Sequence, residues 1–178
     1  MPAALYPRLL GESWPEVDAS VQENHCCGGP LRTVGVFQIS RGTGIGAKFL
    51  LMLLRLPAAA DAAQVSLTVT PDEHGETGSR TIGGRPIVTV QRELAGGLLG
   101  ERFGAFEIRF RLEVVEHAIC YRQMGVTLLP FGISLPAWAS PCVSAREAVD
   151  GVSVELLAPC IGLLLRYEGK LTRTEARP

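Results

Sequence analysis

Residues 106–115, Phe-Glu-Ile-Arg-Phe-Arg-Leu-Glu-Val-Val, alternate apolar and mostly charged side chains. A period of two is that of a β-strand, in which successive side chains point to opposite faces of the sheet. Phe106, Ile108 and Phe110 therefore share one face, while charged residues occupy the other. One buried and one polar face is typical of an antiparallel sheet. We expect this half-buried strand to run over residues 101–115.

Further strand patterns lie on both sides of this stretch and are separated by turns rich in Gly and Pro. No helix of crossover length lies between the later strands, which disfavours a parallel sheet. The sequence therefore predicts an α+β, mainly β fold, in which an antiparallel sheet curls into a barrel or half-barrel. The other predicted strands cover residues 33–40, 65–70, 79–82, 87–94, 119–128, 142–149, 152–157 and 161–171.

Two segments outside these strands predict helices packed on the sheet. Residues 1–30 have apolar spacing that suits short helices broken at Gly11 and Pro15. The apolar run 45–56, stopped by Pro57, is rich in Leu and Met and predicts a helix. Its twelve residues would span about 18 Å, too short for a hydrocarbon layer of about 30 Å. It is either a buried core helix or an interfacial, partner-docking helix whose Lys48 and Arg55 share a face.

Length and charge narrow the function classes. A chain of 178 residues fits one domain, here 1–178, with a helical start and a β-rich body over 31–175. Seventeen basic and eighteen acidic residues give a net charge of −1, so no overall positive field favours the binding of nucleic acid.

The first ten residues lack the pattern of a secretory signal, and we expect a cytoplasmic protein. The five cysteines, an odd number, favour free thiols over a disulfide framework.

Several motifs that would indicate a cofactor or a metal are incomplete. The glycines of Gly42-Thr-Gly-Ile-Gly46 lack the spacing of a dinucleotide-binding turn, and no parallel strand follows. His25-Cys26-Cys27 has no second ligand pair and lacks the usual spacing of zinc ligands. No Gly-x-Ser-x-Gly elbow is present. The sequence therefore predicts no cofactor, no metal and no identifiable catalytic residue, and leaves the role of Cys26 and Cys27 open.

A candidate binding site comes from charged and aromatic residues on the strands. If the sheet curls, such residues could form a pocket with apolar walls and a few Arg and Tyr donors, which would suit an amphipathic ligand bearing an acid group. The alternative is a set of cross-strand Arg–Glu pairs on a solvated face. The insert 130–141 is too Pro-rich for a central strand and too apolar for a solvated loop, so we expect it against the core or over an opening. The predicted ligand-binding residues are Arg102, Trp138, Arg146, Glu147 and Tyr167.

Seven short phrases stand in order along nearly the whole chain. They are Leu5-Tyr-Pro-Arg-Leu-Leu-Gly-Glu-Ser-Trp14, Arg41-Gly-Thr-Gly44 with Leu53-Leu-Arg-Leu-Pro57, Arg80-Thr-Ile-Gly-Gly84, Glu101-Arg-Phe-Gly104, Leu135-Pro-Ala-Trp-Ala-Ser-Pro141, Ala145-Arg-Glu147 and Leu163-Leu-Leu-Arg-Tyr-Glu-Gly169. Read together, they resemble a bacterial family, domain of unknown function 4166. The resemblance implies no settled activity. Members occur alone or attached to reductase-like or membrane-spanning partners, which implies an accessory or binding role.

Three hypotheses about function follow. The first is a non-enzymatic β domain that binds a small apolar or amphipathic ligand, or a protein partner. The second is an enzyme, or an auxiliary domain of an oxidoreductase, acting beside a reductase-like partner. The third is a peripheral membrane module that uses the helix at 45–56.

Overall fold

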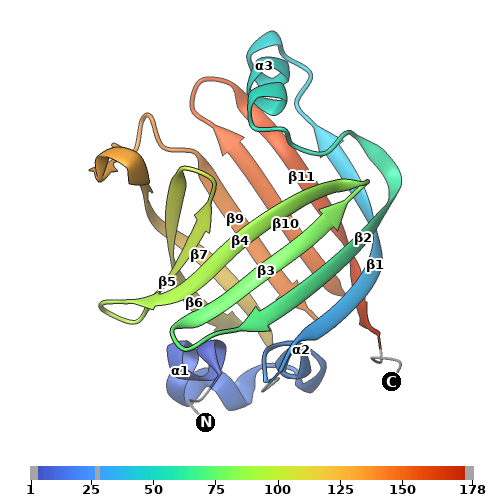
Figure 1. Cartoon of the computed structure of the whole chain (residues 1–178), viewed down its shortest axis with the longest axis vertical. Helices are drawn as coiled ribbons and strands as arrows, with labels where there is room; N and C mark the ends of the chain where they lie inside the picture. The colour runs from blue at the N-terminus through green and yellow to red at the C-terminus, as the bar shows by residue number, and fades with distance from the viewer. Residues whose placement is uncertain (1–3, 27–28, 175–178) are drawn as a thin grey trace.

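The protein is described by a computed structural model, which covers residues 4–26 and 29–174 and consists mainly of β-strands that curl into a barrel (Figure 1). Cys27 lies outside the described residues. The strands are β1 (Leu31–Arg41), β2 (Ala60–Pro71), β3 (Gly75–Ile82), β4 (Arg85–Leu94), β5 (Leu98–Phe103), β6 (Phe106–Val115), β7 (Ala118–Leu128), β8 (Ile133–Ser134), β9 (Cys142–Ala148), β10 (Gly151–Ala158) and β11 (Gly162–Arg173).

Strand pairing closes the sheet into a barrel. Apart from β8, each strand pairs antiparallel with the next one along the chain, and β11 pairs with β1. β6 and β7 stand at opposite ends of the series of ten neighbouring strands, and their pairing closes the ring. The two-residue β8 pairs with β7 and lies outside the ring. The predicted fold class, mainly β with a curled antiparallel sheet, is confirmed. The barrel is closed and has ten strands.

The predicted long strand over 101–115 is wrong, because the structure divides it. β5 ends at Phe103 and β6 begins at Phe106, and these two residues pair across the hairpin. Gly104 between them has φ +56, a left-handed conformation that glycine adopts without a steric penalty. The side chains on both sides of the turn are apolar, which is why the pattern concealed it. The alternation within β6 is confirmed, since Phe110 is buried in the interior.

The N-terminal helices close one end of the barrel, which we call the floor end. They are α1 (Leu5–Leu10), the 3-10 helix η1 (Gly11–Glu16) and α2 (Ala19–His25), and Figure 1 shows α1 and α2 below the strands. Gly11, with φ +52, ends α1, as predicted from the sequence. The predicted break at Pro15 is wrong, because Pro15 lies inside η1. Their apolar side chains pack against strand residues in one buried cluster. It comprises Leu5, Tyr6, Leu10, Val17, Val21, Leu99, Phe110, Leu112 and Ile119.

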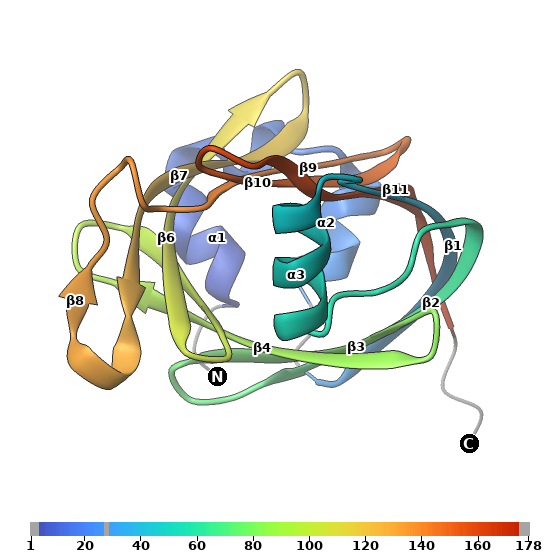
Figure 2. The ribbon, with the colours of Figure 1, turned by 90° about the horizontal axis from the view of Figure 1, so that it is seen from above.

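The opposite end, which we call the mouth end, carries α3 (Ile45–Leu53) between β1 and β2. Seen from above, α3 lies across the opening of the barrel (Figure 2). The helix ends three residues earlier than the predicted 45–56. Arg55 adopts φ +52, and the N–H of Leu56 donates to the carbonyl of Leu51 at 3.0 Å, the bond of a Schellman C-cap. Among the described residues, none of the helices is long and apolar enough to span a bilayer.

The insert 130–141 lies beside a split in the barrel wall. β7 pairs with β9 only over Ile119–Arg122. The side chain of Gln123 then continues the junction, because its amide donates to the carbonyl of Pro141 and its oxygen accepts from the N–H of Val143, both at 2.7 Å. Beyond this point β7 keeps its pairing with β6, and its other side pairs with β8 at Thr127 and Leu128. The insert therefore bridges from β7 to β9 at the mouth end.

The packing of the floor predicts that truncating a buried side chain there lowers the free energy of unfolding. Leu99 in β5 has no exposed surface, and Leu99→Ala should lower the free energy of unfolding by about 2–5 kcal/mol. Val115→Ala is the matched control: Val115 lies at the same end of the barrel but is 49% exposed, so its loss should stay within about 0.5 kcal/mol. Urea denaturation measures both, and equal losses would contradict this account of the floor.

Candidate functional site

The barrel encloses a cavity of about 710 Å³. Small-molecule sites in proteins occupy roughly 300–1,000 Å³, so the volume is that of a ligand site. Leu53 and Trp138 line the cavity and are also 62% and 78% exposed. The cavity therefore reaches the surface at the mouth end.

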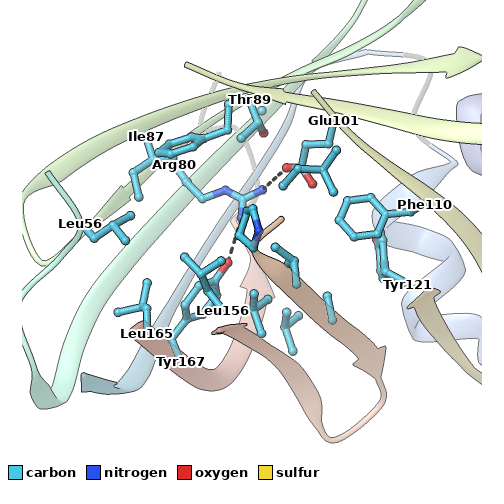
Figure 3. Close-up of a pocket in the computed structure, with 18 of the residues that line it drawn as sticks. Leu56, Arg80, Ile87, Thr89, Glu101, Phe110, Tyr121, Leu156, Leu165 and Tyr167 are labelled. Atoms are coloured by element: carbon cyan, nitrogen blue, oxygen red, sulfur yellow. Dashed lines mark hydrogen bonds and ion pairs between the residues drawn. The ribbon is translucent and has the colours of Figure 1, made fainter. Parts of the chain in front are cut away.

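Apolar side chains form the half of the cavity nearest the mouth. They come from α3, from the mouth-end halves of the strands and from the insert, so they lie far apart in the sequence. Figure 3 shows several of them around the central space. This part of the lining includes Leu50, Leu54, Leu56, Ile82, Ile87, Phe103, Leu135, Leu156, Ile161 and Leu165. Such a wall favours an apolar ligand body through the hydrophobic effect.

Arg80 extends from β3 into the middle of the cavity, between Tyr167 on β11 and Glu101 on β5 (Figure 3). Its guanidinium donates to the hydroxyl of Tyr167 at 3.2 Å and lies 3.8 Å from the carboxylate of Glu101. Burial alone would lower the pKa of Arg80, but the attraction of Tyr167 and Glu101 outweighs it and the pKa is raised. Arg80 is therefore a permanent interior cation. Its buried Nε has no hydrogen-bond partner among the described residues.

A buried ion pair occupies the floor of the cavity. The Nε2 of His25 in α2 lies 3.0 Å from the carboxylate of Glu147 in β9, and the two side chains are only 11% and 13% exposed. Asn24 donates to the same carboxylate at 3.4 Å. Burial opposes both charges, yet each partner stabilises the other, so the pKa of His25 is raised and that of Glu147 is lowered.

Two tyrosines complete the floor. The hydroxyl of Tyr6 donates to Gln91 at 2.9 Å and lies 2.9 Å from the hydroxyl of Tyr121. The ring of Tyr6 also contacts that of His25, with centroids 3.7 Å apart. Burial, reinforced by neighbouring carboxylates such as Glu147, raises the pKa of both tyrosines, so both stay neutral hydrogen-bonding groups.

Glu76 is the unpaired acid of the cavity. It lies near the floor-end start of β3 and lines the cavity, and no described residue forms a hydrogen bond or ion pair with its carboxylate. Burial raises its pKa, the positive charge of His25 opposes that change, and Glu147 and Glu101 add to it. With His25 paired to Glu147 and Arg80 facing Glu101, the interior therefore has spare capacity for a hydrogen-bond donor or a cation. No metal-ligand cluster of His, Cys, Asp or Glu occurs within residues 4–26 and 29–174.

The structure brings together only part of the predicted site. Glu147 and Tyr167 point into the cavity, and Trp138 stands at its mouth. Arg102 lies on the outer wall, where its Nε contacts the carboxylate of Glu107 at 3.0 Å. Arg146 borders the cavity wall, but its side chain is 41% exposed and its guanidinium faces Asp150 at 3.5 Å.

Sequence reasoning did not select most of the polar cavity residues. Glu76 and Arg80 sit in a strand with few apolar residues, so nothing in its pattern marked an inward face. A usable signal was nonetheless present, because Arg80, Glu101 and Tyr6 stand in the phrases that carry the family resemblance. The unselected set comprises Tyr6, Asn24, His25, Glu76, Arg80, Gln91, Glu101 and Tyr121.

Comparison with known proteins identifies a family whose description names no activity. A family model described as "Domain of unknown function (DUF4166)" matches residues 18–171. Neither the curated proteins nor the solved structures contain a match. The cavity's chemistry therefore has to be argued from its own residues.

The His25–Glu147 pair predicts a defined pH dependence. His25, with its raised pKa, contributes stability below about pH 6.5 and loses it as pH rises through that pKa. Glu147, with its lowered pKa, contributes above about pH 4.5 and loses it as pH falls. The stability difference between wild type and His25→Asn should therefore peak between these values, at about 1–3 kcal/mol.

Chemical denaturation across this pH range measures the difference. His74→Asn is the control, because His74 is an exposed histidine in the β2–β3 turn and its replacement should leave the profile unchanged. A His25→Asn difference that does not vary with pH would contradict the ion pair.

Proposed function

The chain belongs to the family Domain of unknown function (DUF4166). Because that description names no activity, we propose from the cavity itself that the barrel binds one small amphipathic molecule. The observation that carries the proposal is the lining: a space of about 710 Å³ with apolar walls toward the mouth and buried polar groups toward the floor. Such a distribution matches a ligand with an apolar body and a polar head. The body would lie between α3 and Arg80, with the head below.

The charges of the cavity favour a head group that donates hydrogen bonds. Three carboxylates, those of Glu76, Glu101 and Glu147, face two basic groups, Arg80 and His25. An anionic head at the floor would meet the unpaired Glu76, whereas an amine or hydroxyl would supply the donor that Glu76 lacks. We therefore propose a lipophilic amine or alcohol, with Glu76 as its main polar contact and Tyr167, Glu147 and Trp138 as further lining residues.

Filling the cavity tests whether it binds at all. Val154 in β10 lies directly across from Tyr167 and Ala145 and lines the cavity, whereas the next residue, Ser153, pairs with Glu168 and Arg146 on the outer wall. Val154→Trp should reduce binding of the neutral dye Nile red at least tenfold, and Ser153→Trp should leave it unchanged. Fluorescence titration measures both, with far-UV circular dichroism to confirm folding. Equal dye binding by the two variants would remove the cavity as the site.

Head-group selectivity tests the role of Glu76. Dodecylamine and dodecanol should displace Nile red from the wild type at lower concentrations than dodecanoate, by about tenfold, which corresponds to about 1.4 kcal/mol. Glu76→Gln should remove most of the preference for the amine, because the amide carries no charge. Tighter binding of dodecanoate would instead assign the head-group contact to Arg80 and Tyr167. Native mass spectrometry of the purified protein would weigh any natural occupant.

A second candidate, an enzyme, is favoured by the His25–Glu147 pair. A histidine held by a carboxylate inside a cavity is a recurrent acid–base arrangement. A ligand recovered chemically changed by the wild type, but unchanged by Glu147→Gln, would favour this candidate. Recovery of an unchanged ligand from both proteins would count against it. The reductase-like protein partner stays a prediction.

A further inference from the structure

The large exposed apolar side chains gather at the mouth end. Among the described residues, every exposed Ile, Leu, Phe or Trp belongs to α3, to the β7–β9 connection or to the β10–β11 turn. The other exposed large hydrophobic residues are valines and one methionine, scattered over the outer wall and the floor end. In the β7–β9 connection, Phe131, Ile133 and Trp138 are 71%, 53% and 78% exposed. A concentration of this kind marks an interaction surface.

α3 carries apolar side chains on both of its faces, and Lys48 is its one charged residue. Ala47 and Leu51 are buried against the barrel, while Ile45, Phe49 and Met52 on the outer side are 90%, 57% and 70% exposed. A helix that is hydrophobic all round is normally enclosed by protein or lipid. The outer face of α3 is therefore exposed to solvent, although its composition is that of a buried surface.

Charge divides the molecule into two unlike ends. At the mouth end, residues 41–61, 82–86, 103–106, 128–142 and 158–163 hold four basic side chains, Arg41, Lys48, Arg55 and Arg85, against Asp61 alone. The floor end, over 4–26, 29–32, 70–75, 93–99, 114–119, 148–152 and 172–174, holds nine carboxylates against three arginines. An anionic surface would therefore attract the mouth end and repel the floor end.

We propose that the mouth end docks on the surface of an anionic lipid bilayer. Phe49, Met52 and Trp138 enter the boundary between headgroups and acyl chains, where apolar and aromatic side chains are favoured. Lys48, Arg55 and Arg85 contact the lipid phosphates. The cavity opens at this same end, so an amphipathic molecule could pass between bilayer and barrel without crossing water. The docking itself requires no cavity ligand and goes beyond the proposed binding function.

Tryptophan fluorescence in the presence of lipid vesicles tests the docking. Trp14→Phe leaves Trp138 as the only tryptophan. Its emission should shift to shorter wavelength and be quenched by brominated lipid with vesicles of phosphatidylcholine and phosphatidylglycerol. Vesicles of phosphatidylcholine alone should bind at least fivefold less protein, and high salt should weaken binding to the mixed vesicles because it screens the attraction. Unshifted emission with both compositions would overturn the proposal.

A matched pair of substitutions distinguishes docking through the mouth end from nonspecific adsorption to vesicles. Phe49→Asp should reduce sedimentation with mixed vesicles at least tenfold, whereas Val88→Asp, at a residue of similar exposure (53%) on the wall strand β4, should not. Nile red binding by Phe49→Asp in vesicle-free buffer shows that the barrel is intact; Met52→Asp replaces this variant if it fails to fold.

Two results would contradict the proposal. One is an equal loss of sedimentation in the Phe49 and Val88 variants. The other is a concentration-dependent dimer that forms through Phe49 without vesicle binding, since it would assign the surface to a second copy of this chain. Failure of vesicle binding with Nile red binding intact would leave the cavity function standing.

Discussion

Closure of the hydrogen-bonded ladder is the constraint on which the rest of the structure depends. Because β6 pairs with β7 and β1 with β11, the ten strands form a closed ring, with a split where β7 and β9 part beyond Arg122, and each strand of the ring acquires an inner and an outer face. Barrel diameter grows with strand number, and about eight strands already suffice for side chains to fill the interior or to hold one small ligand. A ring of ten strands is wider, so its side chains leave the central space unfilled.

The polar groups within that space are tolerated because most of them are paired. A buried charge without a partner is costly, whereas one that is paired and hydrogen-bonded can persist. His25 is held against Glu147, and Arg80 faces Tyr167 and Glu101. Glu76 departs from this arrangement. An acid without a partner, in an interior whose other charged groups face an opposite charge, has no evident structural use, which is why Glu76 is proposed as the contact for the ligand head group.

The two ends of the barrel differ because different segments close them. Amphipathic N-terminal helices pack their apolar side chains against the floor and turn acidic residues to solvent. The mouth receives α3, which is apolar on both faces, and an insert without charges. One end is therefore closed by a packed core, while the other keeps an opening surrounded by apolar and basic groups. Ligand entry and surface contact would both occur at the mouth.

The sequence by itself determined the mainly antiparallel fold, the N-terminal helices and the apolar helix, because local periodicity and turn residues report local backbone structure. Closure was not determined, since β1 and β11 meet through contacts more than a hundred residues apart. The site depended on closure. Arg146 and Glu147 are neighbours in the sequence, yet one faces Asp150 at the surface and the other binds His25 inside. The alternating pattern of a strand does not show whether its charged residues lie inside or outside the barrel. Only the tertiary structure decided which face was enclosed.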